Sequence, residues 1–190
     1  MLVRSIYKSL TQYLFKSHWF YNKKILILYY LVIMKTSLKD LLLWLQLQNM
    51  SYQFRIISND DLHQIIPLVY ELNDAEVSEE LLKLRFNEMK QQNYECAGVY
   101  DKDDLIGVSG LWFCTRHYVG KSVELDHVYI IPEHRSNGIG KQFMAWIENY
   151  VKEKGCNSIE LNTYVQNYPS HKFYYNEGFE ILGYHFLKSI

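Results

Sequence analysis

The sequence predicts one mixed α/β domain over residues 50–190, preceded by a stretch of different character. Two observations support this fold class. Segments in which apolar residues alternate with polar ones, as in a strand, take turns with segments in which they recur at helical spacing. In addition, neither an internal repeat nor a low-complexity linker interrupts residues 50–190. A chain of 190 residues suits one such domain plus an appendage.

The first half of the domain contains the signals for a strand, two helices and a hairpin. In chain order the expected elements are a strand, two helices and two strands, at residues 52–57, 62–72, 78–91, 94–100 and 105–114. The polar run 58–61 supplies N-cap groups for the first helix. Pro67 lies inside that helix and predicts a kink or break there. The charged turn 101–104 between two apolar runs is a hairpin signal.

The second half continues the alternation. Its expected elements are a strand, a helix, a strand, a short helix and a last strand, at residues 121–131, 138–154, 158–165, 170–177 and 179–187. The long helix is strongly amphipathic, and Gly155 is placed to cap its C-terminus. In the strand 121–131, odd-numbered residues such as Leu125 and His127 are expected to share one face.

Residues 130–140 join that strand to that helix and carry the clearest chemical signal. They read Ile-Ile-Pro-Glu-His-Arg-Ser-Asn-Gly-Ile-Gly. A strand that leads through Arg-x-x-Gly-x-Gly into a helix places free backbone N–H groups at a helix N-terminus, which favours phosphate. Side chains at the two glycines would either forbid a positive φ or hold a ligand off the backbone. The stretch predicts a pyrophosphate-bearing ligand, and an ordinary tight loop is the alternative.

Charge and cysteine usage exclude several classes of function. Residues 1–49 hold seven basic residues and one acidic residue, whereas the remainder holds 13 basic and 20 acidic residues. A domain this acidic is poorly suited to binding nucleic acid, because such binding needs a basic surface. The three scattered cysteines form neither a disulfide framework nor a metal-ligand pair, so we expect a reducing cytoplasm and no metal.

Residues 1–49 allow two interpretations. Their apolar run 25–34 is too short to span a bilayer, and no small-residue cleavage site of a signal peptide follows it. Residues 36–47 are consistent with a short amphipathic helix on a membrane or a partner. We favour the other interpretation, in which Met50 is the natural start and the preceding residues are an upstream translation artefact.

Two ordered motifs make the chain resemble the GNAT acetyltransferase superfamily. Residues 124–140 resemble its acetyl-CoA-binding motif. Residues 167–179 resemble its second motif, Asn-x-x-Ala-x-x-Phe-Tyr-x-x-x-Gly-Phe, with Ser170 in place of the alanine. The resemblance implies a mixed, mostly antiparallel central sheet flanked by helices, in the order β-α-α-β-β-β-α-β-α-β.

The resemblance also implies a binding mode for acetyl-CoA as co-substrate. The backbone of Val128 and Ile130 would pair with the pantetheine arm, and Asn167 would bond that arm or position the thioester. The backbone amides that would cradle the pyrophosphate are those of Arg135, Ser136, Asn137, Gly138, Ile139, Gly140 and Lys141. An N–H near Ile130 would polarise the thioester oxygen.

The resemblance assigns two proton transfers. A lysine-like amine has a pKa of about 10.4, so populating its free base at pH 7 costs roughly 4.6 kcal/mol, and a base beside it is useful. Glu124 lies where several histone-type members place a catalytic glutamate, and Asp126 is expected on the same strand face. Tyr174 would be the acid that protonates the departing thiolate.

Simpler structural roles remain open for each of these residues. Glu124 and Asp126 are also consistent with solvent-facing acids, Tyr174 with a packed aromatic, and Asn167 with a helix or turn cap. Residues 116–118 can line the acceptor side or be ordinary polar loop. His127 is expected to be a core histidine rather than a catalyst.

The sequence therefore favours a cytoplasmic N-acetyltransferase that transfers acetyl directly from acetyl-CoA to a primary amine in a ternary complex. The expected acceptor is a small molecule or a peptide, and the paired acids favour a cationic one. We expect no nucleic-acid partner and do not favour a membrane as partner. The resemblance leaves a homodimer open. The alternatives are a non-catalytic CoA-binding or regulatory domain, and an O-acyltransferase or user of another CoA thioester on the same scaffold.

Overall fold

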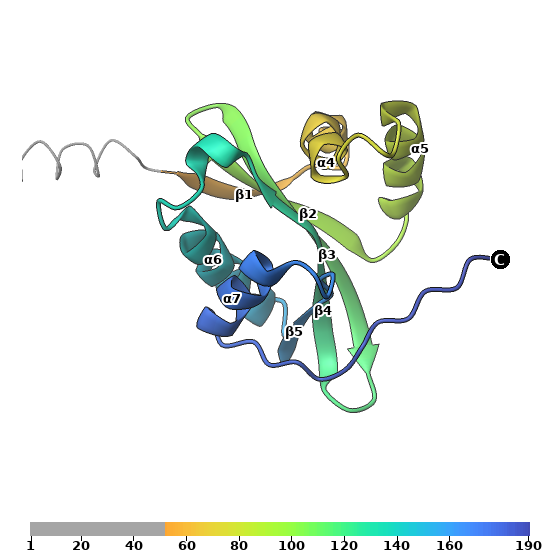
Figure 1. Cartoon of the computed structure of the whole chain (residues 1–190), viewed down its shortest axis with the longest axis vertical. Helices are drawn as coiled ribbons and strands as arrows, with labels where there is room; N and C mark the ends of the chain where they lie inside the picture. The colour runs from red at the N-terminus through yellow and green to blue at the C-terminus, as the bar shows by residue number, and fades with distance from the viewer. Residues whose placement is uncertain (1–51) are drawn as a thin grey trace, which may run out of the picture. The chain divides into compact units, whose positions relative to one another are not determined.

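A computed structural model describes residues 52–190, which form a five-stranded sheet with helices on both faces (Figure 1). The sheet order is β1-β2-β3-β4-β5. The first four strands are antiparallel neighbours, and β5 runs parallel to β4. The expected mixed, mostly antiparallel sheet is confirmed.

The element order follows the sequence prediction up to the last helix. The strands are β1 Gln53–Ile57, β2 Tyr94–Asp101, β3 Asp104–Arg116, β4 Gly120–Ile130 and β5 Ser158–Leu161. The helices are η1 Leu62–Ile65, α4 Ile66–Leu72, α5 Glu79–Met89, η2 Pro132–His134, α6 Ile139–Glu153 and α7 Tyr168–Asn176. The break expected at Pro67 is confirmed, because a 3₁₀ turn precedes α4 and the proline occupies its first turn.

Each face of the sheet has its own hydrophobic cluster. The η1–α4–α5 face packs Leu62, Val69 and Phe86 against strand residues that include Tyr129. The opposite face packs the apolar stripe of α6 against β2, β3 and β4, and α7 joins this second cluster. The stripe is buried at Ile139, Phe143, Ile147 and Val151, one residue per helical turn.

The last strand predicted for residues 179–187 is absent. The described chain has no regular structure after α7, and the segment runs away from the sheet (Figure 1). Its apolar side chains are exposed, with Leu182 at 80% and Phe186 at 89%. The prediction was wrong because an apolar run shows strand propensity but does not supply the neighbouring strand that a sheet requires.

Two smaller boundaries also differ from expectation. The strand expected at 158–165 ends at Leu161, where its pairing with β4 ends. No helix among residues 52–190 has the length and apolar character needed to cross a membrane. The expectations for residues 1–49 lie outside the described residues.

Candidate active site

The site begins where β4 and β5 separate. Their parallel pairing extends only from Ser122 to Leu125 on β4, opposite 158–161 on β5. From residue 126 onward β4 keeps β3 as its only strand partner among the described residues. One backbone edge of β4 is therefore open across Val128 and Ile130, the two positions expected to pair with a pantetheine arm.

A run of free backbone amides follows this open edge. The exposed loop between η2 and α6 turns through Ser136 and Gly138, which have φ values of 64° and 75°. The first backbone bond of α6 is donated by Gln142 to the Gly138 carbonyl. Within residues 52–190 the N–H groups of 136–141 have no hydrogen-bond acceptor. Such a helix N-terminus attracts an anion such as a pyrophosphate.

The expected cradle is shorter by one residue, because Arg135 is already engaged. Its backbone N–H donates to the Pro132 carbonyl at 3.1 Å. Its side-chain Nε donates to the Ile130 carbonyl at 2.6 Å, and its guanidinium carbon lies 5.0 Å from the centre of the Tyr129 ring. Arg135 therefore ties the loop back to the end of β4.

The two glycines of the loop have different roles. Gly138 has a positive φ and open space around the position of a Cβ, which fits close approach by a ligand. At Gly140 an added Cβ would lie 3.3 Å from the Phe173 ring of α7. The second glycine therefore lets α7 pack on the first turn of α6.

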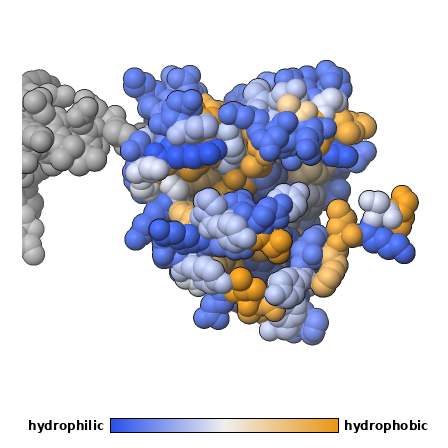
Figure 2. All heavy atoms as spheres, viewed as in Figure 1, coloured by the Kyte–Doolittle hydropathy of each residue, from blue (hydrophilic) through white to orange (hydrophobic). Residues whose placement is uncertain are grey.

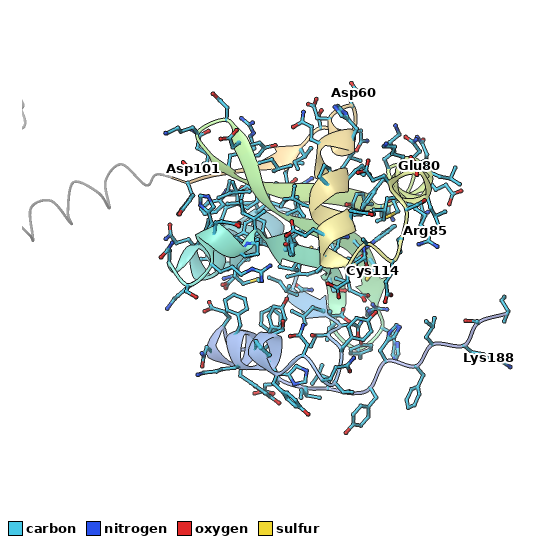
Figure 3. The ribbon with its side chains drawn as sticks, turned by 45° about the horizontal axis from the view of Figure 1, so that its top comes forward. Asp60, Glu80, Arg85, Asp101, Cys114 and Lys188 are labelled. Carbon is cyan, nitrogen blue, oxygen red and sulfur yellow. The ribbon has the colours of Figure 1, made fainter. Side chains whose placement is uncertain are left out.

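A cleft of about 520 Å³ lies on the α4–α5 face, lined by the C-terminal part of β3, the middle of β4 and the residue that follows β5. Figure 3 labels one of its residues, Cys114, on β3. The lining side chains are Trp112, Phe113, Cys114, Arg116, Glu124, Leu125, Asp126, Asn162 and His185. Both expected carboxylates, Glu124 and Asp126, thus reach the same cleft.

Glu124 is held in a polar network that uses both of its oxygens. Its Oε2 pairs with Arg116 Nη2 at 2.8 Å, and its Oε1 accepts a hydrogen bond from Asn162 Nδ2 at 2.6 Å. Arg116 Nε in turn pairs with Glu160 at 2.9 Å, and the Tyr118 hydroxyl donates to the same carboxylate. Both oxygens of Glu124 are therefore engaged by neighbouring side chains, which leaves neither of them free to contact an acceptor amine.

Asp126 lies half exposed at the cleft. The indole Nε1 of Trp112 donates to its Oδ2 at 3.3 Å, and the backbone N–H of His127 donates to its Oδ1 at 2.8 Å. The adjacent imidazole is the main cause that lowers the pKa of Asp126 to about 2, against the opposing effect of burial. Asp126 is therefore ionised across the neutral range and gives the cleft a fixed negative charge.

A bulge in β4 changes the face on which His127 lies. Between the pairs Val108–Tyr129 and Gly110–Asp126, β4 has two residues where β3 has one. His127 takes a φ of 36°, and its ring packs on Phe86 at 5.4 Å. The core position expected for His127 is confirmed, since its side chain is 7% exposed. The face predicted by strict alternation is wrong, because the extra residue turns the ring toward α5.

Tyr174 lies on α7, half-buried on the opposite face of the sheet. Its ring is T-shaped to those of Phe173 and Phe179, at 5.3 and 5.6 Å. Its hydroxyl forms no hydrogen bond with the described residues, and burial raises its pKa to about 12. The phenol therefore stays protonated and free to donate at neutral pH.

Asn167 fills the capping role that was its main alternative. It is the N-cap of α7, and its Oδ1 accepts a long hydrogen bond of 3.4 Å from the Ser170 amide. The side-chain NH₂ group remains available for another acceptor. Among the described residues, no group of three or more His, Cys, Asp or Glu side chains is arranged to hold a metal ion.

The sequence reasoning missed six of the nine residues that line the cleft, among them Trp112, Asn162 and His185. Trp112 could have been found from the hairpin, because pairing Arg116 with Gly120 places it directly opposite Glu124. Asn162 and His185 carried no such signal. Their positions depend on where β5 ends and on the path of the irregular C-terminal segment.

Comparison with known proteins covers most of the described region. A family model described as "Acetyltransferase (GNAT) family" matches residues 59–179. Aminoalkylphosphonate N-acetyltransferase of Salmonella typhimurium is 28% identical over 74 residues, which are 39% of this chain and 48% of that protein. The uncharacterised protein YyaT of Bacillus subtilis is 25% identical over 141 residues, 70% of this chain and 86% of that protein. The first of these matches thus spans about half of its relative.

Solved structures share the fold. A possible acetyltransferase from Clostridium difficile 630 aligns with a TM-score of 0.64 and 16% identity, over 73% of this chain and 97% of its own. The aminoglycoside N-acetyltransferase AAC(6')-Iy in complex with CoA aligns with a TM-score of 0.63 and 19% identity. That alignment covers 74% of this chain and 95% of the enzyme.

Proposed function

The chain belongs to the GNAT family of acetyltransferases, and from that membership we propose that it transfers acetyl from acetyl-CoA to a primary amine by direct transfer in a ternary complex. One observation carries the proposal. The open edge of β4 leads at one end into the free amides of residues 136–141 and at the other end to an acidic cleft. A donor and an acceptor can therefore meet along a single strand.

The donor would be held by backbone more than by side chains. The amides of 136–141 fit its pyrophosphate, and the unpaired edge of β4 at Val128 and at the Ile130 N–H fits its pantetheine arm, since Arg135 already occupies the Ile130 carbonyl. The NH₂ group of Asn167 and the guanidinium of Arg135 are two further donors at the rim. Acetyl-CoA supplies the activated thioester.

The acceptor would be a small cationic amine. Arg116 also lines the cleft and pairs with Glu124, so Asp126 leaves the lining with net negative charge, and the Trp112 ring beside it offers a face to a cation. Several relatives are named for acting on amines, among them the aminoalkylphosphonate enzyme and an aminoglycoside N(6')-acetyltransferase type 1 of Salmonella typhimurium. We extend only the class, a primary amine on a small molecule or peptide, to this chain.

We assign the proton transfers to Asp126 and Tyr174. Asp126 is half exposed in the cleft, and its oxygens accept from the Trp112 indole and the His127 backbone amide, whereas Glu124 is ion-paired with Arg116 and accepts from Asn162. Glu124 then acts as a fixed charge that attracts the acceptor. Tyr174 keeps its proton at neutral pH and donates it toward the leaving thiolate.

A non-catalytic CoA-binding domain is the alternative. The ion-paired state of Glu124 favours it, because that carboxylate is the one that the family motif would use as a base. In that case the donor site would be complete and the cleft would hold a ligand without turnover.

Two measurements separate these functions. Native mass spectrometry of the protein with acetyl-CoA tests the donor site, and release of free thiol in the presence of a panel of primary amines tests turnover. We expect a one-to-one complex and thiol release with at least one cationic amine. Binding without release above background across the panel would favour the non-catalytic domain, and absence of binding would contradict both.

Compartment and assembly are part of the same proposal. All three cysteines are free thiols, which is consistent with a reducing cytoplasm. The exposed segment 180–190 supports a homodimer, because it carries six large apolar side chains (Figure 2). Each such side chain can bury on the order of 150 Å². Together they approach the area of roughly 800 Å² per partner that a stable interface buries. β5, at the edge of the sheet, offers a second copy's segment an unpaired strand.

A further inference from the structure

The guanidinium of Arg116 lies between two carboxylates beside the acceptor cleft, those of Glu124 and Glu160, which we call the acid pair. Its Nη2 donates to Glu124 Oε2 at 2.8 Å, and its Nε donates to Glu160 Oε2 at 2.9 Å. The other oxygens of the acid pair also have donors, since Asn162 donates to Glu124 Oε1 and the same Nε lies 3.1 Å from Glu160 Oε1. One positive side chain therefore engages both acids.

Small residues in the sheet make room for the Arg116 side chain. It starts on β3 opposite Gly120 and reaches Glu160 on β5, two strands away. Neighbouring strands lie about 4.8 Å apart, so the side chain has to extend across β4 to make this contact. Ser122 of β4 lies between the two and is fully buried. The guanidinium is therefore held across the sheet by its two acid partners.

Without Arg116, the acid pair would be a site for another cation. Its two carboxylates lie on one face of the sheet and are partly exposed, 29% for Glu124 and 21% for Glu160. Arg116 supplies the cation from within the chain. Its hydrogen bond to Glu160 raises the pKa of Arg116 above its ordinary value, so the guanidinium stays charged throughout the neutral range.

Asp126 differs from the acid pair in having no such partner. Among residues 52–190, neither an arginine nor a lysine forms a salt bridge with it. Asp126 also lines the cleft, two residues along β4 from Glu124 and thus roughly 7 Å away. An acceptor whose reacting ammonium group lies at Asp126 would therefore bring a second positive charge at that spacing into competition with Arg116.

We propose that Arg116 is a specificity-determining residue that occupies a second cation site of the acceptor cleft, so that the protein favours monoamines over diamines and polyamines. The proposal rests on the N-acetyltransferase function above and names the acceptor class of the same cleft. The reacting ammonium group lies at Asp126, and the part of the acceptor that faces Arg116 is uncharged. A tethered cation loses no translational freedom when it binds, so a free ammonium group competes poorly with it.

The first test compares 1,4-diaminobutane with 4-aminobutan-1-ol, two acceptors of similar length that differ in the second positive charge. The quantity measured is the ratio of their kcat/KM values for thiol release, diamine over amino alcohol, because a general effect of a variant on catalysis cancels in that ratio. Arg116→Ala removes the guanidinium and leaves its space empty. We expect the ratio to rise at least about 10-fold over that of the wild type. The rise should shrink as NaCl is added, because partly exposed charges are screened.

Three further variants control this test. Arg116→Lys keeps a tethered cation and should keep the ratio close to that of the wild type. Arg85→Ala, on the exposed face of α5 (Figure 3), removes an arginine that does not line the cleft and should leave the ratio unchanged. Glu160→Gln leaves Arg116 with one carboxylate and should lower the ratio below that of the wild type. A wild-type ratio in Arg116→Ala would overturn the proposal, and so would a raised ratio in Glu160→Gln.

A binding measurement separates this proposal from the proposed function. Isothermal titration of 1,4-diaminobutane into the protein, with no donor present, reports the cation site without turnover. We expect Arg116→Ala to bind the diamine at least about 10-fold more tightly than the wild type, and ethylguanidinium, which resembles the deleted group, to weaken that binding. If no amine releases thiol but this gain is measured, the proposed function fails and the cation site stands. If thiol is released but neither the ratio nor the affinity changes in Arg116→Ala, the function stands and the specificity proposal is wrong.

Discussion

Tyr174 owes its suitability as an acid to its surroundings rather than to a hydrogen-bonding partner. Burial between Phe173 and Phe179 raises the pKa of Tyr174 to about 12, so its hydroxyl keeps its proton at neutral pH. The same shift has a consequence for stability. The folded pKa is above the unfolded value near 10, so this contribution is complete below about pH 10 and is lost as the pH rises toward about 12.

We expect Tyr174→Phe to lower kcat by about 100-fold or more, because the thiolate then leaves without a proton donor. The ratio of wild-type to variant rates should stay constant from pH 6 to 10 and fall only above that range. Steady-state thiol release measures it. Tyr175→Phe, at the exposed neighbouring position, is the control, and an unchanged rate for Tyr174→Phe would rule out the acid role.

The role that we propose for Glu124 differs from the one that its motif position implies. Because Arg116 and Asn162 hold both of its oxygens, we expect Glu124→Gln to lower kcat by less than about 10-fold while raising KM for a cationic amine. Kinetics with a cationic and a neutral acceptor measure this split. A loss of 100-fold or more in kcat with unchanged KM would instead identify Glu124 as the base.

The loop before α6 works through its backbone. Gly138→Ala forces a side chain into the left-handed region at φ 75°, which costs on the order of 1 kcal/mol. We expect this change to lower the free energy of unfolding by that amount and also to weaken acetyl-CoA binding, because the free amides at the start of α6 shift. Urea unfolding and isothermal titration calorimetry measure the two effects.

Gly155→Ala is the matched control for this loop. Gly155 has a similar φ of 80° and equally open surroundings, but it lies after the C-terminus of α6. We expect the same loss of stability with unchanged binding of acetyl-CoA. Equal loss of binding in both variants would show that helix stability, and not the loop geometry, controls the donor site.

The bulge in β4 shows what an element adds to its residues. A regular strand would direct His127 toward α6 and separate it from Asp126. One extra residue joins the two side chains and also moves Tyr129 to the α4–α5 face, while Val128 and Ile130 face α6. The open edge of β4 and the acidic cleft thus meet at this bulge.

Among residues 52–190, the segment 180–190 carries exposed apolar side chains that join neither hydrophobic cluster. If two copies bury segment 180–190 against each other's β5, the double variant Leu182→Ser with Phe186→Ser should convert a dimer to a monomer. Sedimentation velocity at several concentrations measures this. A wild-type protein that sediments as a monomer at every concentration would contradict the dimer. The apolar character of segment 180–190 would then be explained by pairing with β5 of its own chain.

Element types were readable from the sequence because strand and helix periods are local properties. The α6 stripe, the start of α5 next to Ser78 and the turn 101–104 all appear as expected. The final strand failed for the opposite reason, since its existence depends on a partner strand far away in the chain or on another chain. The bulge in β4 could not be predicted for a similar reason, because an extra residue is defined only relative to the opposite strand.

The loop 130–140 and the motif 167–179 identified the family from the sequence and predicted an acetyl-CoA donor, because backbone amides at a helix N-terminus follow directly from local order. The acceptor side depended on the folded chain. Contacts among β2, β3, β4, β5 and α5 determine that Glu124 is ion-paired, that Asp126 is half exposed and that His127 packs on Phe86. Some of the partners in these contacts are 44 positions apart. Such contacts depend on register and packing, and these exist only once the sheet has formed.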